Sequence, residues 1–207
     1  MPRQSETPRK LKDSFLELVW IQSYGSVSVD AICDRAGVKK GSFYHFFPSK
    51  IALALDALEE YWNSECRPKL DTAFSPSLLP LDRRRAWIAN GLSHVQECID
   101  KHGKVLGCPF YNLGAETSTL EPELAAKVSD IFRRYQKYLV NALRDAHENG
   151  DITLDDIDDT ARDIFTHLEG AITRARITNN PEPLYRLPLT IGRLIGADLS
   201  PAVTQTV

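Results

Sequence analysis

Residues 28–50 constrain the fold of this chain more than any other segment, because two short helical patterns meet there at a glycine. Ser28 is a typical N-cap residue for the pattern 29–36, and Gly37 is a typical residue at a helix end. The second pattern, 40–46, is rich in aromatic residues. A short turn with a glycine lets two helices cross sharply, so the segment predicts a helix-turn-helix unit.

Apolar residues at helical spacing supply a small core for this unit: Val29, Ile32, Cys33, Ala36, Val38 and Phe43. The i, i+3 spacing of Phe43 and Phe46 fits the face that packs on the first helix, so we expect both in the core. In such a unit the second helix lies in the major groove of DNA, and its first residues reach base edges.

Three lysines support an anionic partner. Lys39 and Lys40 precede the second helix, and Lys50 lies in the first turn of the next one. Helix N-termini disfavour cations in the free protein, whereas a phosphate docked there would offset the conflict. The alternative is that all three are ordinary solvated charges. Residues 1–50 carry a net charge of +3 and the rest of the chain carries −6, which fits a cationic head on a polyanion.

The remainder of the chain is also predicted to be helical, since no alternating strand pattern stands out. We expect an all-α fold of about nine helices, with a three-helix helix-turn-helix head at 1–50 and a larger ligand-binding and dimerisation body at 51–207. The predicted helices are 10–24, 29–36, 40–46, 49–66, 82–102, 122–148, 155–177 and 184–199, with a linker at 74–81 and a less regular segment at 105–119.

Several classes of protein are disfavoured. The chain has neither an apolar run of 18 residues nor an apolar segment near its N-terminus, and its four cysteines lack a framework spacing. We therefore expect a cytoplasmic protein that makes no membrane contact. A nucleophile–base motif, a P-loop and a Rossmann fingerprint are absent, so we expect neither an enzyme nor a cofactor. A helical adaptor whose head binds protein is a further alternative.

The segment resembles the tetracycline-repressor-like (TetR) family of transcriptional regulators, whose pattern is close to T-V-x-x-I-A-x-x-A-G-V-S-x-G-x-x-Y-x-Y-F-x-S-K. Here it stands as Ser28-Val29, Ile32-Cys33, Ala36-Gly37-Val38-Lys39-Lys40-Gly41, Tyr44-His45-Phe46-Phe47 and Ser49-Lys50. Cys33 replaces a smaller residue, and Ser23-Tyr24 stands where Gly-Tyr is common. The resemblance implies a homodimeric regulator, a repressor that binds palindromic operator DNA and is released by a small-molecule inducer.

The resemblance also implies roles for individual residues. Ser28 and Lys40 look like contacts to the DNA backbone, and Gly41 permits close approach. Tyr44 and Lys50 look like phosphate contacts. Ser42 and His45 look like base-reading residues. With Lys39, these make the predicted DNA-binding set: Ser28, Lys39, Lys40, Gly41, Ser42, Tyr44, His45 and Lys50.

In the body, a second stripe beside the main apolar face of helix 82–102 predicts burial on two sides, or a core on one side and a cavity on the other. Together with aromatic residues of the irregular segment and helix 122–148, it gives a candidate ligand-binding set: Trp87, Gly91, His94, Cys98, Cys108, Phe110, Tyr111, Phe132 and Tyr135. An ordinary core is the alternative. The inducer is not identified by any of these residues.

Cys108 carries a sharper hypothesis. It lies between Gly107 and Pro109 near a possible helix start, an environment that favours the thiolate. It resembles the sensor thiol of family members that respond to electrophiles or oxidants, and a buried inert cysteine is the alternative. His94, Cys98 and His102 recur at i, i+4, i+8, but no C-x-x-C pair supports them, so we expect no metal site.

The last two predicted helices carry the dimerisation hypothesis. Two apolar stripes run along them: Ile164, Leu168, Ala171, Ile172 and Ala175, then Leu184, Leu187, Ile191, Leu194 and Ile195. Gly170, Gly192 and Gly196 would allow close helix approach. Doubled by a two-fold axis, the two helices would form a four-helix bundle between protomers.

Overall fold

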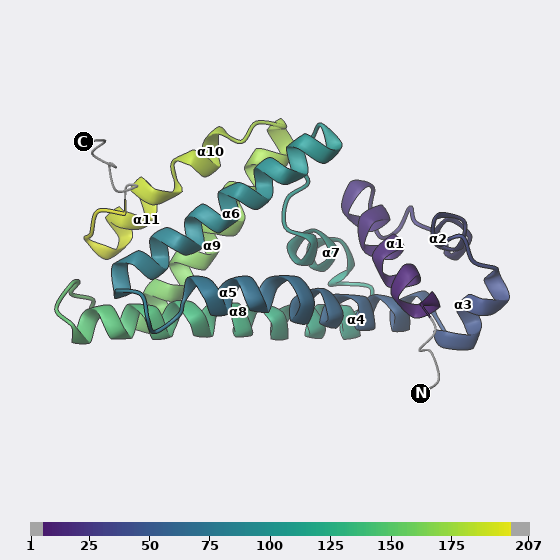
Figure 1. Cartoon of the computed structure of the whole chain (residues 1–207), viewed down its shortest axis with the longest axis horizontal. Helices are drawn as coiled ribbons and strands as arrows, with labels where there is room; N and C mark the ends of the chain where they lie inside the picture. Colours follow the sequence, from purple (N-terminus) through teal and green to yellow (C-terminus); the bar gives the residue numbers. More distant parts are fainter. Residues whose placement is uncertain (1–5, 200–207) are drawn as a thin grey trace. The chain divides into compact units, whose positions relative to one another are not determined.

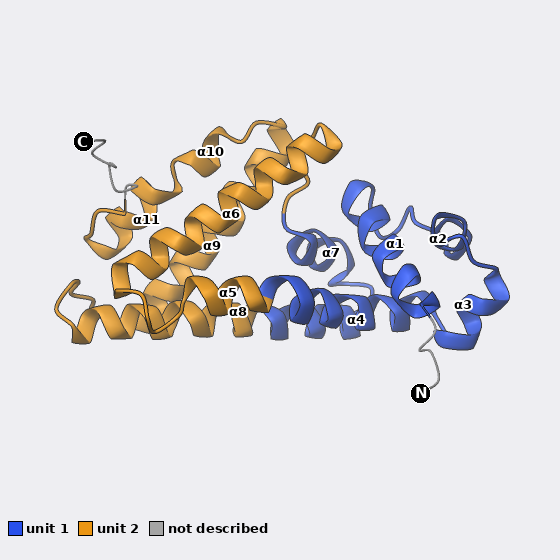
Figure 2. Ribbon diagram, viewed as in Figure 1, with its two compact units in different colours: residues 1–66, 108–131 blue, residues 67–107, 132–207 orange. Residues whose placement is uncertain are grey.

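A computed structural model describes residues 6–199, and within that range every regular element is a helix, as the sequence predicts (Figure 1). The chain forms two compact units (Figure 2). The first comprises the chain up to Cys66 together with residues 108–131, and the second comprises residues 67–107 and the chain from Phe132 onward. The described helices include none that is long and apolar enough to cross a membrane.

The first unit holds the predicted head. Its helices are α1 (Thr7–Ile21), α2 (Val29–Ala36), α3 (Lys40–Phe46), α4 (Lys50–Tyr61), the π-helical turn η1 (Trp62–Cys66), α7 (Pro109–Thr117) and the start of α8 (Pro122–Glu148). Helix α1 packs against α2, α3, α4 and α7. Leu11, Phe15 and Ile32 are fully buried in this core. Each such side chain contributes roughly 1.5–3 kcal/mol by leaving water.

Local capping fixes the helix boundaries of the head. The hydroxyl of Ser28 accepts from the backbone N–H of Ala31 at 3.1 Å, and the hydroxyl of Ser49 accepts from Ala52 in the same way. Gly37 ends α2 with φ of 66°, a left-handed conformation that a residue with a Cβ adopts only at a cost. Helices α2 and α3 therefore have the bounds that the sequence predicts.

The second unit is a helical bundle. It contains α5 (Arg67–Ala73), α6 (Pro80–His102), the rest of α8, α9 (Ile157–Thr178), α10 (Glu182–Tyr185) and α11 (Leu187–Ile195). Helix α6 packs against α5 and α11, and α9 packs against α10 and α11. Asn179 ends α9 with φ of 47°, and its side-chain oxygen accepts from the N–H of Val105 at 3.0 Å.

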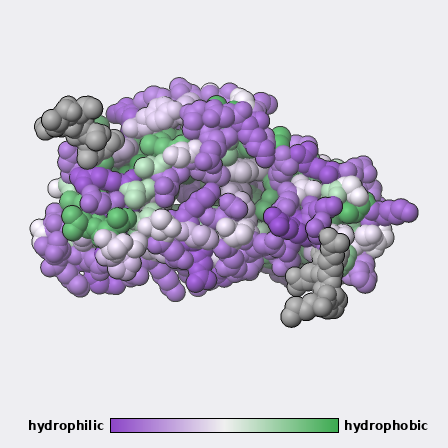
Figure 3. Space-filling model, in the orientation of Figure 1, coloured by the Kyte–Doolittle hydropathy of each residue, from purple (hydrophilic) through white to green (hydrophobic). Residues whose placement is uncertain are grey.

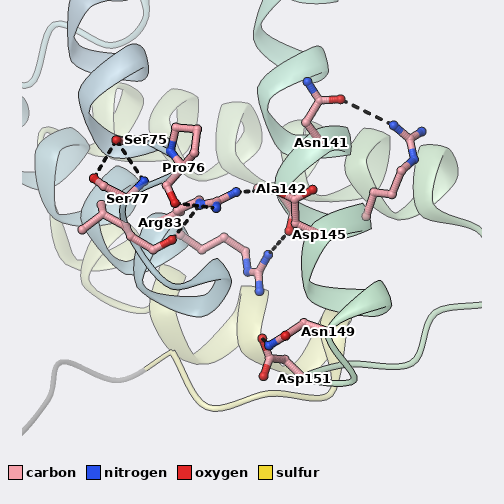
Figure 4. A network of polar contacts seen from close by, with 12 residues as sticks. Ser75, Pro76, Ser77, Arg83, Asn141, Ala142, Asp145, Asn149 and Asp151 are labelled. Atoms are coloured by element: carbon pink, nitrogen blue, oxygen red, sulfur yellow. Dashed lines mark hydrogen bonds and ion pairs between the residues drawn. The ribbon is translucent and has the colours of Figure 1, made fainter.

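Two neighbouring arginines join α6 to the end of α8 (Figure 4). Arg83 forms an ion pair with Asp145 and donates to the carbonyl oxygen of Leu78 at 3.0 Å. Arg84 is fully buried, and its Nη1 donates to the carbonyl oxygen of Ala142 at 2.8 Å. Burial lowers the pKa of the Arg84 guanidinium to about 10.

Three helix predictions differ from the structure. The irregular segment contains α7, which starts with Cys108 as N-cap and Pro109 as its first residue. The final predicted helix is divided by a turn at Arg186, and Pro188, which lacks an N–H, lies in the first turn of α11, where that group would have no partner within the helix. The helix that begins at Lys50 continues through η1 into α5 instead of ending at Cys66.

Candidate nucleic-acid interface

The turn between α2 and α3 is closed by backbone hydrogen bonds. Val38 N–H donates to the carbonyl oxygen of Cys33 at 3.0 Å, and Gly37 N–H donates to that of Asp34 at 3.2 Å. Ile32, Cys33 and Phe43 are buried beneath the turn. This core holds α3 on α2 and leaves the opposite side of α3 exposed.

The exposed side of α3 carries most of the predicted DNA-binding residues. Tyr44 is 52% exposed, although tyrosine is usually more buried than this. Lys39, Lys40, Gly41 and His45 are also exposed, while Ser42 is half-buried. Together with the exposed Ser28 at the start of α2, they give the helix a surface of hydroxyl, imidazole and ammonium groups that can donate to phosphates and bases.

The three phenylalanines at the end of the unit, Phe43, Phe46 and Phe47, differ in burial. Phe43 is fully buried and Phe47 is 7% exposed, and their ring centroids lie 6.1 Å apart. Phe46 is only half-buried, so the expectation that it belongs to the core with Phe43 is met in part. Phe47, rather than Phe46, completes the core.

Lys40 and Lys50 already have partners within the protein, so their charges conflict less with the helix ends than the sequence indicates. The Nζ of Lys40 lies 2.8 Å from a carboxylate oxygen of Asp30, and this hydrogen bond raises the pKa of Lys40. The Nζ of Lys50 donates to the carbonyl oxygens of Tyr24 and Val27 at 2.8 and 2.9 Å. Burial lowers the pKa of Lys50. A phosphate contact by either lysine stays a prediction.

Glu116, on α7, is a residue that sequence reasoning missed. Its carboxylate accepts from the backbone N–H groups of Tyr24 and Gly25, each at 2.8 Å. The α1–α2 loop (residues 22–28) is therefore held by a residue more than 90 positions away in sequence. No local pattern marks such a contact, and α7 itself lies in a segment that the sequence indicates to be irregular.

The candidate ligand-binding residues fall in both compact units. Trp87 and Cys98 are buried in the second unit, His94 is half-buried and Gly91 is exposed. The rings of Phe132 and Tyr135 lie 5.2 and 5.8 Å from that of Phe165, and the ring of Trp87 lies 5.9 Å from that of Phe74. Cys108, Phe110 and Tyr111 belong to the first unit, where Phe110 is buried with its ring 5.7 Å from that of Tyr61.

Cys108 differs from the other three cysteines. Cys33, Cys66 and Cys98 are buried, whereas Cys108 is only half-buried and its Sγ accepts from the N–H of Tyr111 at 3.5 Å at the start of α7. The Sγ of Cys98 lies 4.0 Å from Nε2 of His94. Among residues 6–199, no three His, Cys, Asp or Glu side chains are grouped so that they could hold a metal ion.

The apolar stripes of the last helices are partly used within the protomer. Ile164, Ile191 and Ile195 are buried, whereas Leu189 and Leu194 on α11 are 49% and 43% exposed. Figure 3 shows hydrophobic surface where α11 lies in Figure 1. Other large exposed apolar side chains of α9 and α10 are Ile177 and Tyr185.

The three glycines of these helices have different roles. A Cβ on Gly192 would collide with the carbonyl oxygen of Ala197, so its close contact is with its own chain. Gly196 ends α11 with φ of 68°. Gly170 is exposed, and an added Cβ there would meet nothing within 4 Å among the described residues, so Gly170 alone could serve a contact between helices of two protomers.

A helix-turn-helix unit with an exposed, donor-rich second helix, joined to a helical body, defines a DNA-binding protein of the regulatory class. Residues 16–57 match the family model for bacterial regulatory proteins of the tetR family, and residues 80–189 match the tetracyclin repressor-like C-terminal domain. The chain belongs to the TetR family of transcriptional regulators, and its N-terminal domain is the DNA-binding domain.

Its relatives are named as transcriptional regulators. The transcriptional regulator AcuR of Cereibacter sphaeroides is 34% identical over 194 residues, which cover 93% of this chain and 86% of AcuR. The HTH-type transcriptional repressor DhaR of Mycobacterium sp. is 29% identical over 164 residues, 79% of each chain. The crystal structure of a TetR regulatory protein from Rhodobacter sphaeroides superposes with a TM-score of 0.82 at 34% identity, covering 92% of this chain and all of that one.

Proposed function

We propose that this protein is a dimeric repressor that binds an operator through α3 and leaves it when a small molecule binds the body. The observation that carries the proposal is the exposed side of α3, where Tyr44 and His45 project beside Lys39 and Lys40. When such a helix lies in a DNA groove, its exposed cationic side chains can contact phosphates and its exposed polar and aromatic side chains can reach base edges.

The residues divide by the kind of contact they would make. Lys39, Lys40 and Tyr44 bind phosphates and set the position of the protein on the duplex, whereas Ser42 and His45 read base edges. The Ser28 hydroxyl uses a lone pair to cap α2, so its O–H remains able to donate to a phosphate.

Selection of genomic fragments with the purified protein would return the operator, whose affinity is then measured at several salt concentrations. We expect binding to weaken steeply with salt, because phosphate contacts release counterions. Lys39→Ala should weaken binding to all sequences and reduce the salt slope by roughly one, whereas His45→Ala should change base preference. Lys104→Ala, an exposed lysine of the second unit, is the control. If the Lys39 and His45 variants both bind as wild type does, the assignment of α3 is wrong.

The dimer is proposed to form through α9 and α11. The exposed Leu189 and Leu194 of α11 and the open surface at Gly170 of α9 support this, since α9 and α11 pack against each other and apolar side chains grouped on one surface favour a contact with a partner. Leu194→Glu should give monomers in sedimentation velocity, whereas Leu120→Glu, at an exposed leucine of the first unit, should remain dimeric. Dimers of the Leu194 variant would exclude this interface.

The inducer is proposed to contact the candidate ligand-binding residues of the body. The Phe132–Tyr135–Phe165 ring cluster and the buried Trp87, whose ring lies 5.9 Å from that of Phe74, would supply the apolar surface that small-molecule sites use. A tryptophan-fluorescence screen, repeated on a Trp87→Phe variant to isolate the signal of Trp87, would identify ligands, and those that release operator DNA would be inducers. Retained release by such a compound in a Phe132→Ala, Tyr135→Ala variant would place the site elsewhere.

The second candidate is a sensor in which Cys108 reacts with an electrophile or oxidant. It is favoured by the partial exposure of Cys108 at the start of α7, in contrast to three buried cysteines. Treatment with an aldehyde or quinone should release the operator from wild type and not from Cys108→Ser. Cys98→Ser is the control, because burial raises the pKa of Cys98 and so disfavours its thiolate. Equal sensitivity of wild type and Cys108→Ser would exclude this function.

A further inference from the structure

We propose that Glu116 is a positioning residue for DNA binding, which fixes the α1–α2 loop and makes the placement of α7 a condition for operator affinity. The inference rests on the proposed DNA-binding function of α3. It concerns only the first compact unit, to which Glu116, the loop and α3 all belong.

The first observation is a charge-assisted double contact. Oε2 of Glu116 accepts from Tyr24 N–H and Oε1 accepts from Gly25 N–H, both at 2.8 Å. Hydrogen bonds to an ionised carboxylate are stronger than those between neutral groups. A Cβ on Gly25 would lie 3.2 Å from Oε1, so a glycine allows the carboxylate to approach this closely.

The second observation is a cation that holds the other polar groups of the same loop. Lys50 donates to the carbonyl oxygens of Tyr24 and Val27, and its Nζ lies 3.9 Å from the centroid of the Tyr24 ring. Tyr24 and Val27 are both buried. The carboxylate of Glu116 therefore fixes two N–H groups, and the ammonium of Lys50 fixes two carbonyls, within four consecutive residues.

This loop sets the position of α3. It ends at Ser28, the N-cap of α2, and α2 packs against α3, with Ile32, Cys33 and Phe43 buried. A shift of the loop moves the start of α2 and, with it, the residues that would face the bases. Displacements of about 1 Å are enough to disrupt hydrogen bonds whose lengths are confined to a few tenths of an ångström.

The third observation is the close packing of α7 against α8. A Cβ on Gly114 would lie 2.9 Å from Cγ1 of Val128 on α8, so α7 and α8 are in close contact two residues before Glu116. Cys108 is the N-cap of the same helix. It precedes Glu116 by about 12 Å along the helix axis, at a rise of 1.5 Å per residue. A movement or rotation of α7 would therefore change the hydrogen bonds between Glu116 and the loop.

The test combines DNA binding with amide exchange of the full-length protein. In Glu116→Ala we expect the amides of Tyr24 and Gly25 to exchange at least about tenfold faster by NMR, since two protecting hydrogen bonds are lost. Affinity for the selected operator should fall about tenfold or more with an unchanged salt slope, because Glu116 touches no phosphate. Glu116→Gln keeps one acceptor and should fall between wild type and Glu116→Ala. Glu123→Gln, an exposed acid at the start of α8, is the control.

The role of α7 has its own test. Gly114→Ala should push α7 from α8, accelerate exchange at Tyr24 and Gly25, and weaken operator binding. Val128→Ala added to Gly114→Ala removes the collision and should restore both readouts. Failure of this rescue in a folded double variant would overturn the role of α7.

Two outcomes separate the inference from the function on which it rests. If the wild-type protein selects no DNA, the proposed function fails. If wild type binds an operator and Glu116→Ala binds it equally well, or keeps the protection of both amides, only the role of Glu116 is overturned.

Discussion

Lys50 lies over the ring of Tyr24 and donates to the carbonyl oxygen of the same residue, at 3.9 Å from the ring centroid and 2.8 Å from the oxygen. One side chain thus contacts both the ring and the backbone of a buried tyrosine. The sequence motif indicates a phosphate contact at Lys50, and the structure adds a role within the protein.

Lys50→Ala should therefore lower stability as well as DNA affinity. Loss of two hydrogen bonds from a charged donor to partly buried carbonyls costs about 1–3 kcal/mol in the free energy of unfolding. Urea unfolding followed by circular dichroism measures this, with Lys104→Ala as the exposed control. If the variant unfolds at the same urea concentration as wild type, water solvates the two carbonyl oxygens without any loss of stability.

Tyrosine ionisation should destabilise the protein only at high pH. Burial is the main cause that raises the pKa of Tyr24 and of Tyr138 to about 12, above the ordinary value of 10. Glu116 and Glu121 act in the same direction on Tyr24, as does Asp71 on Tyr138. A raised folded-state pKa means that the associated stability is complete below pH 10 and is lost as pH rises from 10 through 12.

Absorbance at 295 nm follows this titration directly. Tyr24 and Tyr138 should ionise near pH 12, and Tyr24→Phe and Tyr138→Phe should each remove one late step. Complete ionisation of the tyrosine side chains by pH 11, with the protein still folded, would contradict this prediction.

Replacement of Arg84 should be tolerated or stabilising. Its Nε and Nη2 are buried and have no hydrogen-bond partner among the described residues, so its charge is poorly compensated. Arg84→Met keeps much of the volume and removes that cost, and we expect the free energy of unfolding to rise by up to about 2 kcal/mol or to stay unchanged. Chemical unfolding checks this. A loss above about 3 kcal/mol would mean that the bond to Ala142 outweighs the desolvation of the guanidinium.

Alanine at Gly192 and at Gly170 should have opposite effects. Gly192→Ala places a methyl group against the carbonyl oxygen of Ala197 and should cost about 1–3 kcal/mol. Within one protomer an added Cβ on Gly170 of α9 meets nothing within 4 Å among the described residues, so in the monomeric Leu194→Glu background Gly170→Ala should gain up to about 1 kcal/mol from helix propensity. Thermal unfolding compares the Tm values of the two variants. A shift of Tm in the same direction for both would contradict the difference in packing between Gly192 and Gly170.

The boundaries of α2 and α3 could be predicted because the residues that fix them are local. Ser28 bonds three residues ahead, and Gly37 satisfies the backbone of its own helix. The core residues Ile32 and Phe43 follow helical periodicity. Recognition of the family followed from the same short segment.

Helix α7 could not be predicted in this way. Glycines and a proline interrupt its pattern, and burial of Phe110 and Leu113 against the rest of the first unit stabilises it instead. The contacts of Glu116 join positions more than 90 residues apart, so they cannot be predicted from local periodicity or capping patterns. The assignment of the ligand-binding residues has the same limit, since it depends on which helices meet.

The π-helical turn at Trp62–Cys66 has a consequence for insertions and deletions in this region. Buried residues follow one another there in steps of four, at Leu58, Trp62, Cys66 and Leu70. Steps of four advance by about 40° per turn on a regular α-helix, and the wider π turn takes up part of that drift. Deletion of one residue within the turn would leave an unbroken helix, yet every side chain after it would change phase and Leu70 would leave its buried face.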